Sequence, residues 1–105
     1  MTVVLTYKFE PTGDGTLDPA GLRKLQKEYP GLKLPGVLSY NVYRNLTKRL
    51  MFAEIELENY SVMDAWESWA WSPEGRDWGL KFNKCGKFVE LIILCLLYTS
   101  PSPRD

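Results

Sequence analysis

Hydrophobic and polar residues alternate along three stretches of the chain, which is the period-two pattern of a strand with one buried face. These stretches are residues 3–9, 37–44 and 50–58. A fourth stretch, residues 88–94, is apolar and rich in β-branched side chains. Proline, glycine and polar residues, which favour turns, border these stretches. The pattern therefore predicts four β-strands.

A first helix is predicted between the first two strands. Asp18 can cap its N-terminus, and Pro19 suits the first helical position because a proline has no N–H to satisfy. The apolar residues that follow at helical spacing on one side are Leu22, Leu25 and Tyr29. The Pro-Gly pair at positions 30–31 ends the helix.

A second helix is predicted after the third strand. Ser61 and Asp64 resemble a capping box at its start. A second start signal follows at residues 72–74, where serine, proline and glutamate suit the cap and the first turn. The helix is therefore expected to break near Trp71, restart, and end at Gly86.

The predicted element order is β-α-β-β-α-β, which indicates an α+β protein with a ferredoxin-like fold. Right-handed crossovers then give one four-stranded antiparallel sheet of strand order 4-1-3-2, with the two helices on one face. A chain of 105 residues fits one domain. The domain is expected to span residues 1–94.

The last residues differ in character from the rest of the chain. Residues 95–105 match, position by position, one reading frame of a transposase-type sequencing adapter. The alternative is a natural disordered tail, for which the Ser-Pro composition alone would suffice. We expect residues 95–105 to be a translated adapter tail, and such segments do not enter fold reasoning.

Composition and charge exclude several partners. Thirteen basic residues balance thirteen acidic ones, so no long-range field attracts nucleic acid. The longest apolar run, residues 91–97, is too short to span a bilayer, and no signal-peptide pattern is present at the start. The two cysteines form no disulfide framework. We expect a cytoplasmic protein that binds neither nucleic acid nor membrane.

The chain contains no histidine, which removes the usual general base and the commonest metal ligand. It also has no glycine-rich phosphate loop, no Ser-His-Asp set and no metal-ligand spacing. Lys84 and Lys87 could lower the thiol pKa of Cys85, yet the sequence offers that thiol no base or partner. No metal site and no cofactor are predicted, and the catalytic residues stay unknown.

The phrase E-x-E-x-E-N-Y…A-W…S-P-E-G, which begins at Glu54 and ends at Gly75, resembles the dimeric α/β-barrel superfamily. It is similar to the antibiotic-biosynthesis-monooxygenase, EthD-like and NIPSNAP-like branches, and the resemblance covers residues 2–93. It implies two sheets packed face to face across a two-fold axis, with a pocket beside each sheet. Haem-degrading members use a histidine on the second helix, and this chain departs from them because it has none.

The resemblance implies a protein that binds a small hydrophobic or aromatic molecule. Some members of the superfamily oxidise polyphenols without a cofactor, and others isomerise lactones, so a cofactor-independent monooxygenase or isomerase is one hypothesis. The alternative is a non-catalytic module for ligand binding, dimerisation or a stress response. A shared fold cannot choose between them, and whether the chain is an enzyme stays open.

The predicted sheet face without helices also indicates a homodimer. Lys8 would lie between strands that carry Glu54 and Glu90, and opposite charges on neighbouring strands stabilise a sheet modestly. The alternative is the solvated sheet face of a monomer. Contiguous apolar side chains usually mark a contact surface. Those expected on this face are Tyr43, Phe52, Phe88 and Ile92.

Four tryptophans lie between positions 66 and 78 and supply the candidate binding site. Trp66 and Trp78 either pack the core or line a pocket for a flat ligand. The side chains expected to line that pocket are Tyr7, Phe9, Tyr40, Trp66 and Trp78, with Asn41 and Arg44 as polar groups. Hydrogen bonding at the dimer face for Asn41, and a solvated hairpin end for Arg44, are the alternatives. Trp69 and Trp71 are expected to point elsewhere.

The two hypotheses differ in what should lie beside Trp66. An enzyme predicts a closed cavity with at least one buried, convergent polar group. A non-catalytic module predicts that the aromatic rings fill the same space themselves.

Overall fold

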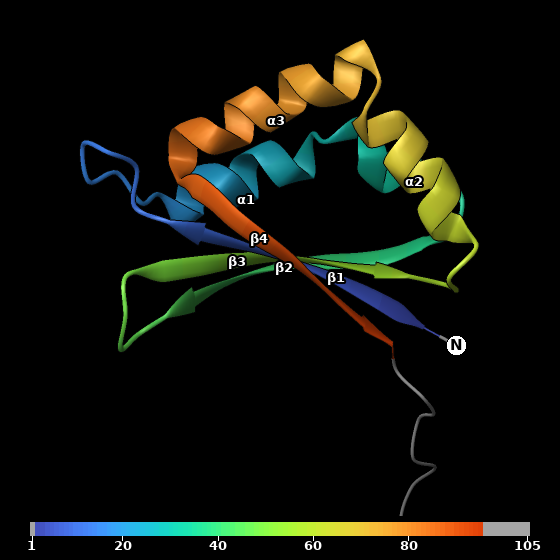
Figure 1. The fold of residues 1–105 in the computed structure, drawn as a ribbon, viewed down its shortest axis with the longest axis horizontal. Helices are drawn as coiled ribbons and strands as arrows, with labels where there is room; N and C mark the ends of the chain where they lie inside the picture. Colours follow the sequence, from blue (N-terminus) through green and yellow to red (C-terminus); the bar gives the residue numbers. More distant parts are fainter. Residues whose placement is uncertain (1, 96–105) are drawn as a thin grey trace, which may run out of the picture.

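The computed structural model describes residues 2–95, which form one sheet and a layer of helices. The elements in chain order are β1 (Val3–Glu10), α1 (Pro19–Lys27), the 3₁₀ helix η1 (Pro30–Lys33), β2 (Val37–Asn45), β3 (Leu50–Leu57), α2 (Val62–Ala70), α3 (Pro73–Cys85) and β4 (Lys87–Cys95). Figure 1 shows the helices gathered on one side of the sheet, with the other side bare.

The sheet has the predicted topology. Its strand order is β2-β3-β1-β4, and each neighbouring pair is antiparallel. β1 and β3, the two central strands, bury alternate residues beneath the helices. This confirms the α+β, ferredoxin-like fold with strand order 4-1-3-2, and the break between α2 and α3 falls where the second start signal was predicted.

Two of the three predicted helix caps are formed. The Asp18 side chain accepts a hydrogen bond from the Gly21 N–H, and the Ser72 hydroxyl accepts one from the Gly75 N–H. The capping box at Ser61 was a wrong prediction. The backbone of Ser61 is already helical, and its hydroxyl donates to the Asn59 side chain at 2.5 Å, so it caps no N–H of α2.

The core lies between the helices and the sheet in two clusters. The first contains Val3, Leu5, Tyr29, Ile55, Leu57 and Trp66. The second contains Phe9, Leu22, Met51, Ala53 and Cys85. Tyr7 and Phe82 pack against both clusters, so these two side chains join them into one apolar layer.

Two irregularities in strand pairing correct the predicted faces. Phe9 pairs with Phe88 while Lys8 pairs with Glu90, so Val89 is an extra residue and Phe88 lies on the helix side. Phe88 was expected on the bare face. A similar shift between residues 37 and 39 leaves Leu38, expected to face the helices, 55% exposed.

The bare face of the sheet carries polar side chains paired across strands. Lys8 Nζ lies 3.7 Å from a carboxylate oxygen of Glu90, as predicted, whereas Glu54 lies opposite Thr6 rather than Lys8. The Tyr43 hydroxyl donates to Glu54 at 3.4 Å. Apolar side chains that share this face are Val4, Phe52, Ile92 and Leu94.

The expected adapter tail is mostly outside the described residues. Cys95 is the last residue of β4 and pairs with Val3, while residues 96–105 are not described. The adapter origin of residues 95–105 stays a prediction. Among residues 2–95, no helix is both long enough and apolar enough to cross a membrane.

Candidate functional site

A hydrogen bond joins the sheet to α2 beneath the helical layer. The indole Nε1–H of Trp66 donates to the hydroxyl oxygen of Tyr7 over 3.0 Å. Trp66 is only 3% exposed, and Tyr7 is half-buried. An indole N–H can only donate, so the Tyr7 oxygen acts as the acceptor and keeps its own proton.

Tyr29 lies at the centre of an aromatic cluster above this bond. The centroid of its ring lies 4.9 Å from that of Phe82 and 5.2 Å from that of Trp69, both in edge-to-face arrangement. Trp66 and Trp78 contact the same ring at 5.7 and 5.6 Å. Such geometries add to the stability that burial of the rings provides. We call these five residues the Tyr29 cluster.

Trp69 belongs to this cluster, so the expectation that it points elsewhere was wrong. η1 holds it there: a Cβ added at Gly31 would lie 3.0 Å from ring atoms of both Trp66 and Trp69. Only a glycine permits that approach without a shift of the rings. Trp71 is 67% exposed, which agrees with the prediction for that residue.

The predicted pocket residues are distributed over three places. Tyr7, Tyr40 and Trp78 are half-buried around the first core cluster, which contains Trp66. Phe9 belongs to the second cluster. The two polar candidates lie apart from Trp66: Asn41 is exposed on the bare face opposite Glu54, and Arg44 is exposed near the β2–β3 turn.

The sequence prediction missed Gln26, a buried polar residue on the inner face of α1. Gln26 is 2% exposed, and its side-chain oxygen has no hydrogen-bond partner in the described part of the chain. Unpartnered buried acceptors are uncommon because they lose their hydration without compensation. The sequence did contain a signal for its burial: Gln26 lies four residues after Leu22 and three before Tyr29, which places it on the apolar side of the helix.

Two hollows stand out at the surface of the described residues, and neither is lined by Trp66 or Trp78. One, of about 260 Å³, lies beside the β2–β3 turn. The other, of about 360 Å³, lies between α1 and α3 next to Cys85. Burial raises the thiol pKa of Cys85, and the negative charge of Asp18 raises it further. Cys85 is therefore an inert core thiol.

An apolar surface lies beside Tyr7 on the helix-facing side of β4. Leu91 pairs with Tyr7 across the sheet, and the rings of Phe88 and Tyr7 have centroids 5.9 Å apart. Phe88, Leu91 and Ile93 are 39–44% exposed because α3 covers only part of this edge strand. We call these three residues the β4 shelf, and Figure 1 shows β4 running out from beneath the helices.

Burial raises the pKa of both inner tyrosine hydroxyls. For Tyr7 the hydrogen bond from Trp66 offsets part of the effect, and for Tyr29 the proximity of Tyr7 adds to it. Both hydroxyls therefore remain protonated at neutral pH, so they can donate a hydrogen bond and do not serve as bases.

These shifts predict a loss of stability in alkali. An unfolded tyrosine ionises near the ordinary tyrosine pKa of 10.0, whereas the folded state holds its protons to higher pH. Above about pH 10, ionisation of the tyrosines therefore lowers the free energy of the unfolded state but not that of the folded state, and the free energy of unfolding falls. Urea unfolding at about pH 8 and pH 11 measures this loss. Tyr29→Phe should reduce it, while Tyr60→Phe, at an exposed position, should not.

No family model and no curated protein matches the sequence. Solved structures do match the fold. SnoaB from Streptomyces nogalater, a cofactor-independent oxygenase crystallised as a variant, superposes with a TM-score of 0.71 at 13% identity over 96% of this chain and 98% of its own.

Two further structures cover nearly the whole chain. A candidate antibiotic biosynthesis monooxygenase from Chloroflexus aurantiacus has a TM-score of 0.64 and 16% identity, over 96% of this chain and 98% of its own. Rv0793 from Mycobacterium tuberculosis has a TM-score of 0.61 and 15% identity, over 97% and 99%. The chain therefore has the same ferredoxin-like fold as these solved structures.

Proposed function

We propose that the chain binds a small, flat aromatic molecule on the β4 shelf, against the Tyr7 and Trp66 pair. The observation that carries this proposal is the hydrogen bond from Trp66 Nε1 to the Tyr7 hydroxyl at 3.0 Å. It fixes the hydroxyl oxygen and leaves the hydroxyl proton for an oxygen atom of the ligand. The exposed side chains of Phe88 and Leu91 next to Tyr7 offer an apolar surface for the ligand ring.

The reaction that this arrangement supports is oxygenation without a cofactor. A phenolic substrate that loses a proton to solvent develops charge on its oxygen, and a donor held in a fixed position stabilises that charge. Molecular oxygen then supplies one atom to the ring carbon and the other to water. The substrate itself provides all four electrons that reduce O₂ as its CH₂ group becomes a carbonyl, and the two hydrogens of that group leave in the water. The likeness in fold to SnoaB, a cofactor-independent oxygenase, supports this reaction over isomerisation.

The second candidate function is ligand binding or dimerisation without catalysis. The close packing of the Tyr29 cluster favours it, because four rings surround Tyr29 at centroid distances of 4.9–5.7 Å. In that case the aromatic residues are structural, and any ligand on the β4 shelf is bound but not converted.

We also propose that two copies associate through the bare face of the sheet. Val4, Phe52 and Ile92 are only half-buried there in the single chain, and their polar neighbours are already paired across strands. Apolar side chains that stay half-buried on an otherwise uncovered face usually mark a contact surface. A reducing cytoplasm is the proposed setting, because Cys85 is a free thiol.

A titration with a dihydroxyanthrone, a flat phenol with a CH₂ group, tests the ligand site. Tyr7→Phe removes the donor but keeps the ring, so we expect the dissociation constant measured by tryptophan fluorescence to rise about tenfold. Tyr60→Phe is the matched control at an exposed position and should bind like the unaltered chain.

Oxygen uptake separates the two candidate functions. An oxygenase consumes one O₂ for each dihydroxyanthrone converted to the quinone, and Tyr7→Phe slows that conversion. Binding without oxygen uptake would support the non-catalytic module. Equal affinity of the Tyr7→Phe chain would contradict the proposed site itself.

A further inference from the structure

The hollow beside the β2–β3 turn differs in chemistry from the apolar β4 shelf. Its volume is about 260 Å³, which is room for several water-sized groups at about 30 Å³ each. Two segments form it: the turn between β2 and β3, and the loop that leads into α1. Figure 1 shows these segments at the end of the sheet away from α2, so this hollow is separate from the β4 shelf.

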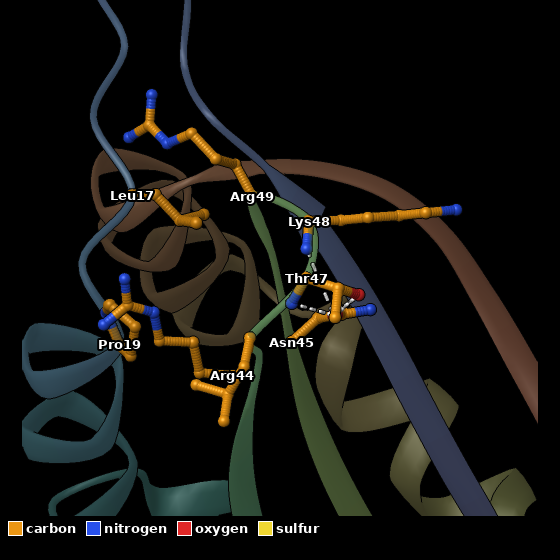
Figure 2. Close-up of a pocket in the computed structure, with 8 residues that line it drawn as sticks. Leu17, Pro19, Arg44, Asn45, Thr47, Lys48 and Arg49 are labelled. Atoms are coloured by element: carbon orange, nitrogen blue, oxygen red, sulfur yellow. Dashed lines mark hydrogen bonds between the residues drawn. The ribbon is translucent and has the colours of Figure 1, made fainter.

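Cationic side chains dominate the lining of this hollow. Arg44, Lys48 and Arg49 line it, and no acidic side chain among residues 2–95 does. Figure 2 shows Arg44 and Arg49 extending toward the side with Leu17 and Pro19, while Lys48 extends to the opposite side. The carboxylate of the same loop, Asp14, instead accepts hydrogen bonds from Thr12 and Thr16. Hydrogen bonds with these hydroxyls lower the pKa of Asp14.

Hydrogen bonds within the two segments hold the hollow open in one shape. Arg49 Nη2 donates to the Gly15 carbonyl at 2.9 Å, which fixes one guanidinium against the loop. The Asn45 side-chain oxygen accepts from the N–H groups of Thr47 and Lys48 at 2.9 and 3.2 Å, which fixes the turn. Arg44 has no acceptor for its guanidinium among residues 2–95, so its donors remain available.

We propose that this hollow binds a small divalent oxyanion between Arg44 and Arg49. Guanidinium groups present paired N–H donors that match phosphate and carboxylate oxygens. Leu17 and Pro19 give the hollow an apolar wall, which strengthens a charge interaction by excluding water. The class of ligand is a phosphate, or a dicarboxylate of similar size, free or as part of a small molecule.

Titrations of the full chain with inorganic phosphate and with malonate, followed by amide chemical shifts, test this site. At constant ionic strength, we expect saturable shifts centred on Leu17, Thr47 and Lys48. A response to phosphate alone assigns a tetrahedral anion, and a response to malonate alone assigns a carboxylate. Absence of a saturable response to both overturns the proposal.

Variants separate the site from general attraction to basic residues. Arg44→Gln should weaken the binding about tenfold, the effect expected from one lost charge-assisted hydrogen bond. Arg44→Lys keeps the charge but loses the paired N–H donors of the guanidinium, so it should also weaken the binding. Arg23→Gln, at an exposed position on α1, is the matched control. Equal weakening by Arg23→Gln and Arg44→Gln, or no effect of Arg44→Gln, overturns the proposal.

Discussion

Replacing Trp66 with alanine is expected to lower the free energy of unfolding by about 3–5 kcal/mol. Trp66 is 3% exposed, its ring packs edge-to-face against Tyr29, and its Nε1–H bonds the Tyr7 hydroxyl. Alanine removes the buried ring, leaves a cavity and deprives Tyr7 of its partner. Native proteins have total stabilities of about 5–15 kcal/mol, so this substitution removes a large share of the total. Urea unfolding followed by circular dichroism measures the change.

The matched control is Trp71→Ala, which also removes an indole ring, here from the residue that follows α2. Trp71 is 67% exposed and lies 5.8 Å from the Arg76 guanidinium, a cation–π contact in solvent. Its loss should cost less than about 1 kcal/mol. Similar destabilisation by both substitutions would mean that Trp66 does not hold α2 to the sheet.

Replacing Phe52 with glutamate is expected to dissociate the proposed dimer. Phe52 lies on the bare face of β3, opposite Lys8 on β1 and Tyr43 on β2. In a face-to-face dimer the new carboxylate would be buried near Glu54, and Lys8, the cation opposite it, already pairs with Glu90. Loss of a buried aromatic anchor costs about 2 kcal/mol or more, so the dissociation constant should rise at least about thirtyfold. Sedimentation velocity over a concentration series measures it.

Leu80→Glu is the matched control, because Leu80 is an exposed apolar residue on α3, on the helical side of the molecule. It introduces the same charge away from the proposed interface and should leave the dimer mass in solution unchanged. A monomer mass for the unaltered chain at micromolar concentration would contradict the dimer. A shift as large for Leu80→Glu would place the interface on the helices.

Local signals in the sequence were sufficient to predict the elements and their order. Asp18 and Ser72 cap the helices that they were expected to cap, because a capping bond depends on residues three positions away. Alternation along β1 and β3 identified the buried faces, because these central strands have one face against the helices. The fold followed from these elements and from the handedness of the crossovers.

Features that depend on how neighbouring strands pair could not be predicted from local signals. The extra residue at Val89 moves Phe88 to the helix side, and only the pairing with Phe9 reveals it. The Tyr29 cluster was missed for a similar reason. Its members come from α2, α3 and the start of η1, and the sequence did not show that Trp69 would turn toward Tyr29.

The candidate site was predicted in part. Tyr7, Tyr40, Trp66 and Trp78 were expected together, and all four contribute to the first core cluster. The bond between Tyr7 and Trp66 was not foreseen, because it joins residues 59 positions apart. Gln26 was missed because a glutamine within an amphipathic helix usually faces solvent.

The central claim is that a flat phenol lies against Tyr7 and Trp66 on the β4 shelf. Nuclear Overhauser effects between a bound dihydroxyanthrone and the protein test it most directly. We expect contacts from the ligand protons to the rings of Tyr7 and Phe88 and to the Leu91 methyl groups. Contacts confined to exposed aromatic residues such as Trp71 and Tyr60 would contradict it.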